Sequence, residues 1–254
     1  RDPVLRQLAA TLHTRVALLR LSTGDFEGGV AALRKMARRS DLGEDCREQA
    51  CFLLAQSLTE RAAAGHAELT QWRHELADDL RGMLTRRGDV AAALQRPAQS
   101  QGPSVSSSRL RDFDLSIGLA EILGSLQEHA EQERWLAQAQ QIADSLPKMS
   151  PDRVRNLMAQ RAECALAMRQ PATATDAVAH ALPRLGDDPM ANYLAATLLG
   201  QAHAMDPPDA ARARDLFVRA LRAAVTAPQL RGQARRQPQF ASLLQDPEVV
   251  ELLR

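Results

Sequence analysis

Aromatic residues are scarce in this chain of 254 residues: they make up 3% of it, while hydrophobic residues make up 45%. β-Sandwiches and β-barrels depend on aromatic and β-branched residues, because these side chains pack well on a pleated surface. Alanine and leucine supply most of the apolar side chains instead. Since small and medium side chains of this kind suit closely packed helices, we expect an all-α fold.

Cysteine is also sparse, with Cys46, Cys51 and Cys164 as its three positions. An odd and small set argues against a disulfide framework and indicates a reducing compartment, so we expect a cytoplasmic protein. No apolar run approaches the roughly 20 residues that a membrane-spanning helix needs. The chain begins at Arg1, and its abundant alanine and arginine are typical of a GC-rich genome. We therefore expect a part of a larger bacterial protein.

An excess of charge of one sign is missing too, because the formal net charge is +1. A dedicated nucleic-acid binder presents a strongly basic surface, so we expect no nucleic-acid partner. The basic runs at residues 34–39 and 86–87 lie at the ends of expected helices, where the helix dipole favours cations. Arg231, Arg235 and Arg236 lie between expected helices and are the better candidates for a partner contact.

Motifs for catalysis and cofactor binding are absent from the sequence. It holds neither a glycine-rich phosphate loop nor a dinucleotide fingerprint. His74-Glu75-Leu76-Ala77-Asp78 resembles a zinc-protease helix, but aspartate stands where the second histidine ligand is needed. Cys46 and Cys51 are five residues apart on one expected helix, and we interpret them as core thiols. We expect no catalytic residue, no metal and no cofactor, and hence no enzyme; a site formed only by spatial convergence is the weaker alternative.

Apolar residues recur at three- and four-residue steps along most of the chain, which predicts amphipathic helices. Residues 1–95 form two expected hairpins, residues 109–228 form three, and residues 229–254 form a capping segment. Residues 96–108, rich in proline and serine, favour a linker or a long loop, with a protruding regulatory loop as the alternative. The expected helices span residues 4–22, 26–39, 44–64, 66–86, 109–127, 129–146, 152–169, 172–183, 189–205 and 208–226, and short helical pieces follow at 239–244 and 247–253.

Glycine and proline mark where these helices begin and end. Gly24-Asp25 predicts a break, because glycine tolerates the positive φ that ends a helix. Gly28 and Gly29 lower the stability of the next helix, because glycine is a weak helix former. We expect that they allow two helices to pack closely, and that this packing offsets the loss. The run Pro183–Gly186 predicts a helix end. Asp246-Pro247-Glu248 predicts a helix start, with a cap, a proline and then an acid.

One pattern recurs among the later helix pairs. Leu199-Gly200 in one helix is followed by Ala213, Phe217 and Ala220-Leu221 in the next, which predicts small residues where two helices cross closely. Earlier pairs repeat the pattern less completely, at intervals of roughly 33–38 residues. The pattern resembles the tetratricopeptide repeat family, and the run from Phe240 to Leu252 resembles the tail of such arrays in bacterial proteins. The family's early tryptophan is missing, and residues 43–87 fit poorly.

The resemblance implies a right-handed α-solenoid of antiparallel helix pairs, in which the first helix of each pair lines a concave groove. It further implies a protein–protein interaction or scaffolding module, a regulatory or adaptor part that binds a polypeptide segment in the groove. The alternative is a structural domain that oligomerises through its convex faces and ends. The groove candidates are polar and mildly acidic, which favours a basic or polar segment: Thr11, Thr14, Asp114, Glu121, Asn156, Glu163, Thr197 and Gln201.

Overall fold

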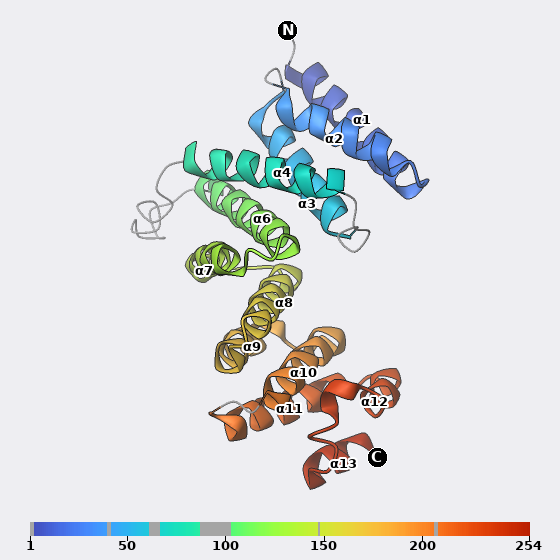
Figure 1. The fold of residues 1–254 in the computed structure, drawn as a ribbon, viewed down its shortest axis with the longest axis vertical. Helices are drawn as coiled ribbons and strands as arrows, with labels where there is room; N and C mark the ends of the chain where they lie inside the picture. Colours follow the sequence, from blue (N-terminus) through green and yellow to red (C-terminus); the bar gives the residue numbers. More distant parts are fainter. Residues whose placement is uncertain (1–2, 40–41, 61–66, 87–102, 147, 206–207) are drawn as a thin grey trace. The chain divides into compact units, whose positions relative to one another are not determined.

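The computed structural model describes the chain except for residues 1–2, 40–41, 61–66, 87–102, 147 and 206–207 (Figure 1). In these described ranges all regular secondary structure is helical and no strand occurs, so the expected all-α fold is confirmed. The chain divides into two compact units, Arg1–Ile142 and Ala143–Arg254. The division falls near the end of one α-helix and not at the serine-rich segment of residues 96–108.

The first unit is built around one central helix. Its helices are α1 (Pro3–Ser22), α2 (Phe26–Arg38), α3 (Glu44–Glu60), α4 (Ala67–Arg86), α6 (Pro103–Ser125) and most of α7 (His129–Ser145). Helix α3 contacts α1, α2, α4 and α6. Fully buried leucines from four of these helices form the core, namely Leu33, Leu58, Leu80 and Leu119. Burial of such apolar side chains is the main stabilising contribution to the unit.

The turn between α1 and α2 follows from its residues. Gly24 adopts a φ of +90°, the left-handed conformation that the sequence predicts at this break. The Asp25 carboxylate then accepts a hydrogen bond from the Gly28 N–H at 3.0 Å and caps α2. A Cβ on Gly29 would lie 2.6 Å from Leu21 Cγ. The expected close approach of the two helices is therefore confirmed at Gly29, whereas Gly28 lies against the capping aspartate.

The second unit stacks its helices in chain order. After the last turn of α7 it contains α8 (Pro151–Ala167), α9 (Pro171–Leu185), α10 (Pro189–Ala204), α11 (Ala210–Ala224), α12 (Pro228–Ala234), the 3₁₀ turn η3 (Pro238–Phe240) and α13 (Pro247–Leu253). Each of α8, α9 and α10 packs on the helix that follows it, and α8 also contacts α10. Ser150 and Asp188 cap α8 and α10 with their side chains, and each precedes a proline at the first helical position.

The pattern around Gly200 marks a close approach to the closing segment of the chain, in addition to the expected packing of α10 on α11. Ala213 and Phe217 are fully buried in α11, as the pattern predicts. A Cβ on Gly200 would lie 2.7 Å from the Gln239 carbonyl oxygen and 3.0 Å from Phe240 Cδ1. The Phe240 ring in turn meets the Phe217 ring edge to face, with 4.8 Å between the ring centroids. Gly200 therefore makes room for the closing segment of the chain.

An ion-pair network holds this closing segment. The Arg214 guanidinium donates to both carboxylate oxygens of Asp246, at 2.8 and 3.0 Å, and to Glu248 at 3.0 Å. Asp246 also accepts a hydrogen bond from the Glu248 N–H at 2.9 Å, so the helix start predicted at Asp246-Pro247-Glu248 is confirmed. The Arg235 guanidinium donates to the Leu253 carbonyl oxygen. Together these contacts fasten α13 to α11 and α12.

Several expectations from the sequence are wrong. The short helix expected at residues 239–244 is a 3₁₀ turn at Pro238–Phe240 followed by further turns, and α12 at Pro228–Ala234 was not expected. Helix α6 begins at Pro103, so the predicted linker of residues 96–108 is wrong from that residue on, and its earlier part lies outside the described residues. The helix end predicted at the run Pro183–Gly186 is confirmed, because α9 ends at Leu185 before Gly186 with a φ of +61°, but Pro183 itself lies inside the helix. Arg231 lies within α12 instead of between helices. The burial of Leu182 and Leu185 in the core outweighs the tendency of Pro183 to end the helix.

Candidate functional site

One face of α3 lines two hollows on the surface of the first unit. Gln49, Phe52, Leu53 and Gln56 recur at three- and four-residue steps, which places them on one side of the helix. The side chains of Gln49 and Gln56 are exposed, and those of Phe52 and Leu53 are partly buried. Glu48, Gln49 and Phe52 face α6, while Leu53 and Gln56 face α1. The first helices of three successive pairs thus meet at this face of α3.

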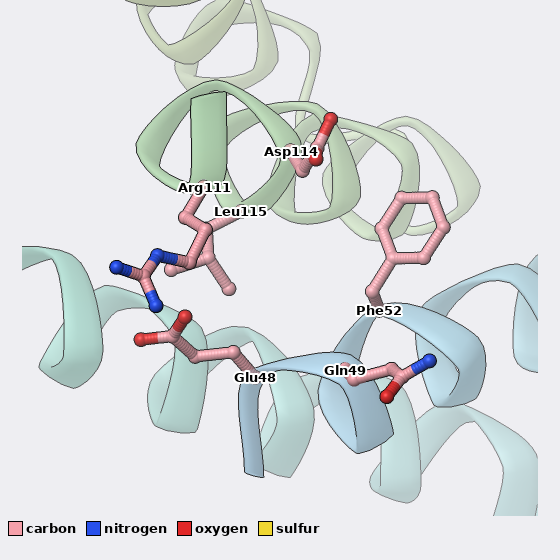
Figure 2. A pocket seen from close by; sticks show the side chains of 6 residues that line it. All are labelled: Glu48, Gln49, Phe52, Arg111, Asp114 and Leu115. Atoms are coloured by element: carbon pink, nitrogen blue, oxygen red, sulfur yellow. The ribbon is translucent and has the colours of Figure 1, made fainter. Parts of the chain in front are cut away.

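The hollow between α3 and α6 has a volume of about 170 Å³. Phe52 and Leu115 supply its apolar walls, and Gln49 lies at its edge (Figure 2). Figure 2 also shows the Glu48 carboxylate and the Arg111 guanidinium on the same side, pointing toward one another from α3 and α6. Apolar walls with a few polar groups are typical of pockets that receive a side chain or a small ligand.

The hollow between α1 and α3 is larger, with a volume of about 520 Å³. Apolar side chains from three helices line about half of it, and polar groups line the rest. The lining residues are Leu18, Leu21, Ser22, Phe26, Leu53, Gln56 and Ser57. The helix face that lines the α6 hollow therefore continues into a second hollow, which is larger and more polar.

One of the four groove candidates in the first unit lines a hollow. Asp114 lines the α3–α6 hollow, and Glu121, seven residues later on α6, is half-buried. Thr11 is exposed on α1, seven residues before Leu18, and so lies on the same side of that helix as the larger hollow. Thr14 is buried instead, and its hydroxyl contacts Met36 Sδ at 3.9 Å. Thr14 is buried by the packing of α1 on α2, so it is not available to a partner.

The groove candidates in the second unit lie on α8 and α10. Asn156 accepts a hydrogen bond from the Gln160 amide at 3.2 Å, and the Thr197 hydroxyl donates to the Tyr193 carbonyl oxygen at 3.0 Å. The Glu163 side chain reaches solvent, yet surrounding protein atoms desolvate its carboxyl and raise its pKa. Gln201 is half-buried. The two helices that carry these residues contact one another.

The residues on α3 are the part of this surface that the sequence reasoning missed. Residues 43–87 fit the repeat pattern poorly, so no groove position was assigned there. The alternation of amides and apolar side chains at Gln49, Phe52, Leu53 and Gln56 is the signal that could have found it. A helix face with both kinds of residue is neither a plain core stripe nor a plain solvated face.

The run that resembles a zinc-protease helix has a structural role. The Glu75 carboxylate accepts hydrogen bonds from Arg34 and Arg38 on α2, and these contacts lower its pKa. The Asp78 carboxylate accepts a hydrogen bond from Arg81 at 2.8 Å. Arg81 also binds Glu131 through two hydrogen bonds of 2.7 and 2.8 Å. In the described parts of the chain, no cluster of histidine, cysteine and carboxylate side chains could hold a metal ion.

The cysteines are buried thiols, as the sequence predicts for core positions. Burial raises the pKa of the Cys51 thiol to about 12, so the thiolate form that attacks electrophiles or binds metal is nearly absent at neutral pH.

The basic residues singled out from the sequence also contact other parts of the fold. The Arg34 guanidinium lies 5.0 Å from the centroid of the Trp72 ring, in addition to its contact with Glu75. Arg235 donates to the carbonyl oxygen of Leu253. These contacts give both arginines a structural role.

None of the helices in the described ranges combines the length and the apolar character that crossing a membrane requires. The chain was compared with family models, curated proteins and solved structures, and no match was found among them.

Proposed function

We propose that this chain is a protein–protein interaction module that binds a polypeptide segment along the first helices of its helix pairs. The observation that carries the proposal is the face of α3 at Gln49, Phe52, Leu53 and Gln56. This one face lines a hollow against α1 and another against α6. Two hollows on one helix face suit a bound chain whose successive side chains enter them.

The chemistry of the surface favours a polar or basic segment with apolar anchors. Phe52, Leu53 and Leu115 offer apolar walls to such anchors. The exposed amides of Gln49 and Gln56 can both donate to and accept from a bound backbone. Asp114 and Glu121 add negative charge along α6, which attracts lysine or arginine.

We also propose the wider architecture that the resemblance implies, a right-handed solenoid of the tetratricopeptide kind. Asn156, Glu163, Thr197 and Gln201 then present a second binding surface on α8 and α10. The whole acts as the adaptor or regulatory part of a larger bacterial protein. Support for this comes from the packing of helices that follow one another in the chain, such as α1 on α2 and α8 on α9, and from the contact of α1 with α3 and of α8 with α10.

The test is a partner-binding measurement on the full-length protein. A partner is first isolated by affinity purification from the host and then purified. Binding is measured by titration calorimetry for the wild type and for the double variant Gln49→Arg, Gln56→Arg. Both side chains are exposed, so the variant keeps the core intact. We expect its affinity to fall by about tenfold or more, because two bulky cations enter the hollows.

The matched control is Gln141→Arg, which changes an exposed glutamine on α7, the second helix of its pair. We expect this variant to bind like the wild type. Equal affinity of the partner for the double variant and the wild type would overturn the proposal. In that case the alternative hypothesis, a structural domain that holds a complex together through its convex faces and ends, would replace it.

A further inference from the structure

Helix α1 has two apolar faces, and the fold covers only one of them. Ala17 and Leu21 lie on the covered face, where Leu21 meets Gly29 of α2. Leu12, Val16 and Leu19 form a stripe on the other face, at steps of four and three residues. Their exposed fractions are 54%, 51% and 62%, among the highest of the large apolar residues in the described chain. A helix normally buries its apolar face against another element.

Positive charge borders this stripe on both edges. With about 100° of rotation per residue, Arg15 lies on one side of the stripe and Arg20 on the other. Both side chains are exposed, and Arg20 retains half of its exposure although it approaches Asp25 at 3.8 Å. The sequence of α1 contains no aspartate or glutamate. The exposed face is therefore a two-turn apolar stripe with cationic edges.

We propose that this face binds an amphipathic helix of another protein, one whose apolar stripe is bordered by glutamate or aspartate. The stripe of Leu12, Val16 and Leu19 spans about 10 Å along α1, which matches two turns of a partner helix that presents residues at the same spacing. Acidic residues at the partner's flanks complement Arg15 and Arg20, and this complementarity selects the partner. Helix-on-helix packing of this kind buries the three side chains together.

Charge argues against a second copy of this chain as the occupant. A symmetric pairing of α1 with α1 brings the same surface together twice. Because α1 has arginines and no acidic residue, such a pairing brings the arginines of one copy close to the arginines of the other. Like charges at an interface weaken association.

A lipid surface is also disfavoured as the occupant. Helices that lie in a membrane interface carry a strongly polar face opposite their apolar one. In α1 the opposite face is apolar and packs on α2 through Ala17 and Leu21. The exposed stripe also has no tryptophan or phenylalanine to insert at the headgroup level.

This inference is independent of the proposed groove, because the stripe and the groove side of α1 differ. Thr11 and Leu18 lie about 100° around the helix from Leu12 and Leu19, on the side of the hollow that Leu18 lines. Substitutions in the stripe can therefore remove one binding activity and leave the other. Failure of either proposal is distinguishable from failure of the other.

The test uses a display library of amphipathic helices with a fixed leucine stripe, in which the flanking positions vary among glutamate, glutamine and lysine. The full-length protein selects from it, and the selected peptides are titrated by fluorescence anisotropy. We expect enrichment of glutamate at the flanks. We also expect about tenfold weaker binding by Val16→Gln, Leu19→Gln, which removes apolar contact area, and by Arg15→Glu, which reverses a flanking charge.

Met190→Gln is the matched control, because Met190 on α10 is 57% exposed; we expect it to bind like the wild type. Each stripe substitution lies on a solvent-exposed side chain, and a circular dichroism spectrum checks that the variant is helical. No enrichment, enrichment of lysine, or binding that survives the stripe variants would overturn the proposal. Two other results would also overturn it. Self-association in sedimentation that the stripe variants abolish would assign the face to a second copy, and retention on anionic phosphatidylserine vesicles that the stripe variants abolish would assign it to lipid.

Discussion

Gly200→Ala tests the packing of the closing segment, because two opposing terms can be weighed from the structure. Alanine is favoured over glycine inside a helix by about 1 kcal/mol. The new Cβ, however, would lie 2.7 Å from the Gln239 carbonyl oxygen, while ordinary contact begins at 3.4 Å. The backbone of the closing segment must then retreat by about 0.7 Å. Overpacking of this kind costs about 1–3 kcal/mol.

The segment cannot retreat freely, because Phe240 is fully buried against Phe217 and Asp246 is bound to Arg214. We therefore place the cost of overpacking near the upper end of that range. After the gain in helix propensity is subtracted, the free energy of unfolding falls by about 1–2 kcal/mol. For a unit of this size, the loss lowers the melting temperature by about 4–8 °C. Circular dichroism melts of the full chain measure it, and amide exchange of residues 228–253 shows whether the closing segment loosens first.

Gly232→Ala supplies the matched control, because nothing lies within 4 Å of a Cβ at Gly232 in α12. Only the higher helix propensity of alanine acts there, so we expect the free energy of unfolding to rise by up to about 1 kcal/mol. The two variants should change stability in opposite directions. A Gly200→Ala protein as stable as the wild type, with unchanged exchange in the closing segment, would refute the close approach.

Two further predictions concern single ionisable groups. Cys51 should resist iodoacetamide at pH 8 until the chain is denatured, because its thiol is buried with a pKa of about 12; fast labelling of the native protein would contradict this. Arg214 lowers the pKa of Asp246 from 3.8 to about 2, so the carboxylate stabilises the fold above pH 4 and loses its effect as the pH falls from 4 toward 2. Amide exchange of α13 should report this loss in the wild type, and identical acid profiles for the wild type and Asp246→Asn would argue against it.

Helix ends with a local chemical cause were predictable from the sequence. At Gly24-Asp25, a positive φ and an aspartate cap follow from the two residues themselves. The same holds at Asp246-Pro247-Glu248, where cap, proline and acid are adjacent in the sequence. In each case the partners lie within three residues of one another, so no knowledge of the distant fold is required.

Features that depend on distant neighbours were not predictable. The serines before Arg109 are weak helix formers, yet α6 runs through them from Pro103, and further along it buries Phe113 and Ile117. Pro183 forfeits a helical hydrogen bond, yet α9 continues past it to bury Leu185. Tertiary burial outweighs local propensity at both positions. The repeat pattern predicted the packing of α10 on α11, but not the closing segment that lies against Gly200.

Helical spacing alone did not fix which groove candidates lie at the surface. Asp114 on α6 lies in a hollow, as a groove residue should, whereas Thr14 is turned into the contact with α2. Neighbouring positions on a helix can differ completely in burial. The spacing of residues in the sequence predicts the direction of a side chain only to within one such position. The α3 face was missed because its hollows form between helices far apart in sequence.

Photocrosslinking from α3 tests the proposed groove most directly. A photoreactive phenylalanine derivative replaces Gln49 in the full-length protein, and in a second protein it replaces Gln141 as the control. Both are expressed in the host and irradiated there. We expect a crosslink to a polypeptide segment of another protein from position 49 and none from position 141. Crosslinks from position 141 alone, or the same crosslink from both positions, would contradict a partner bound along the first helices.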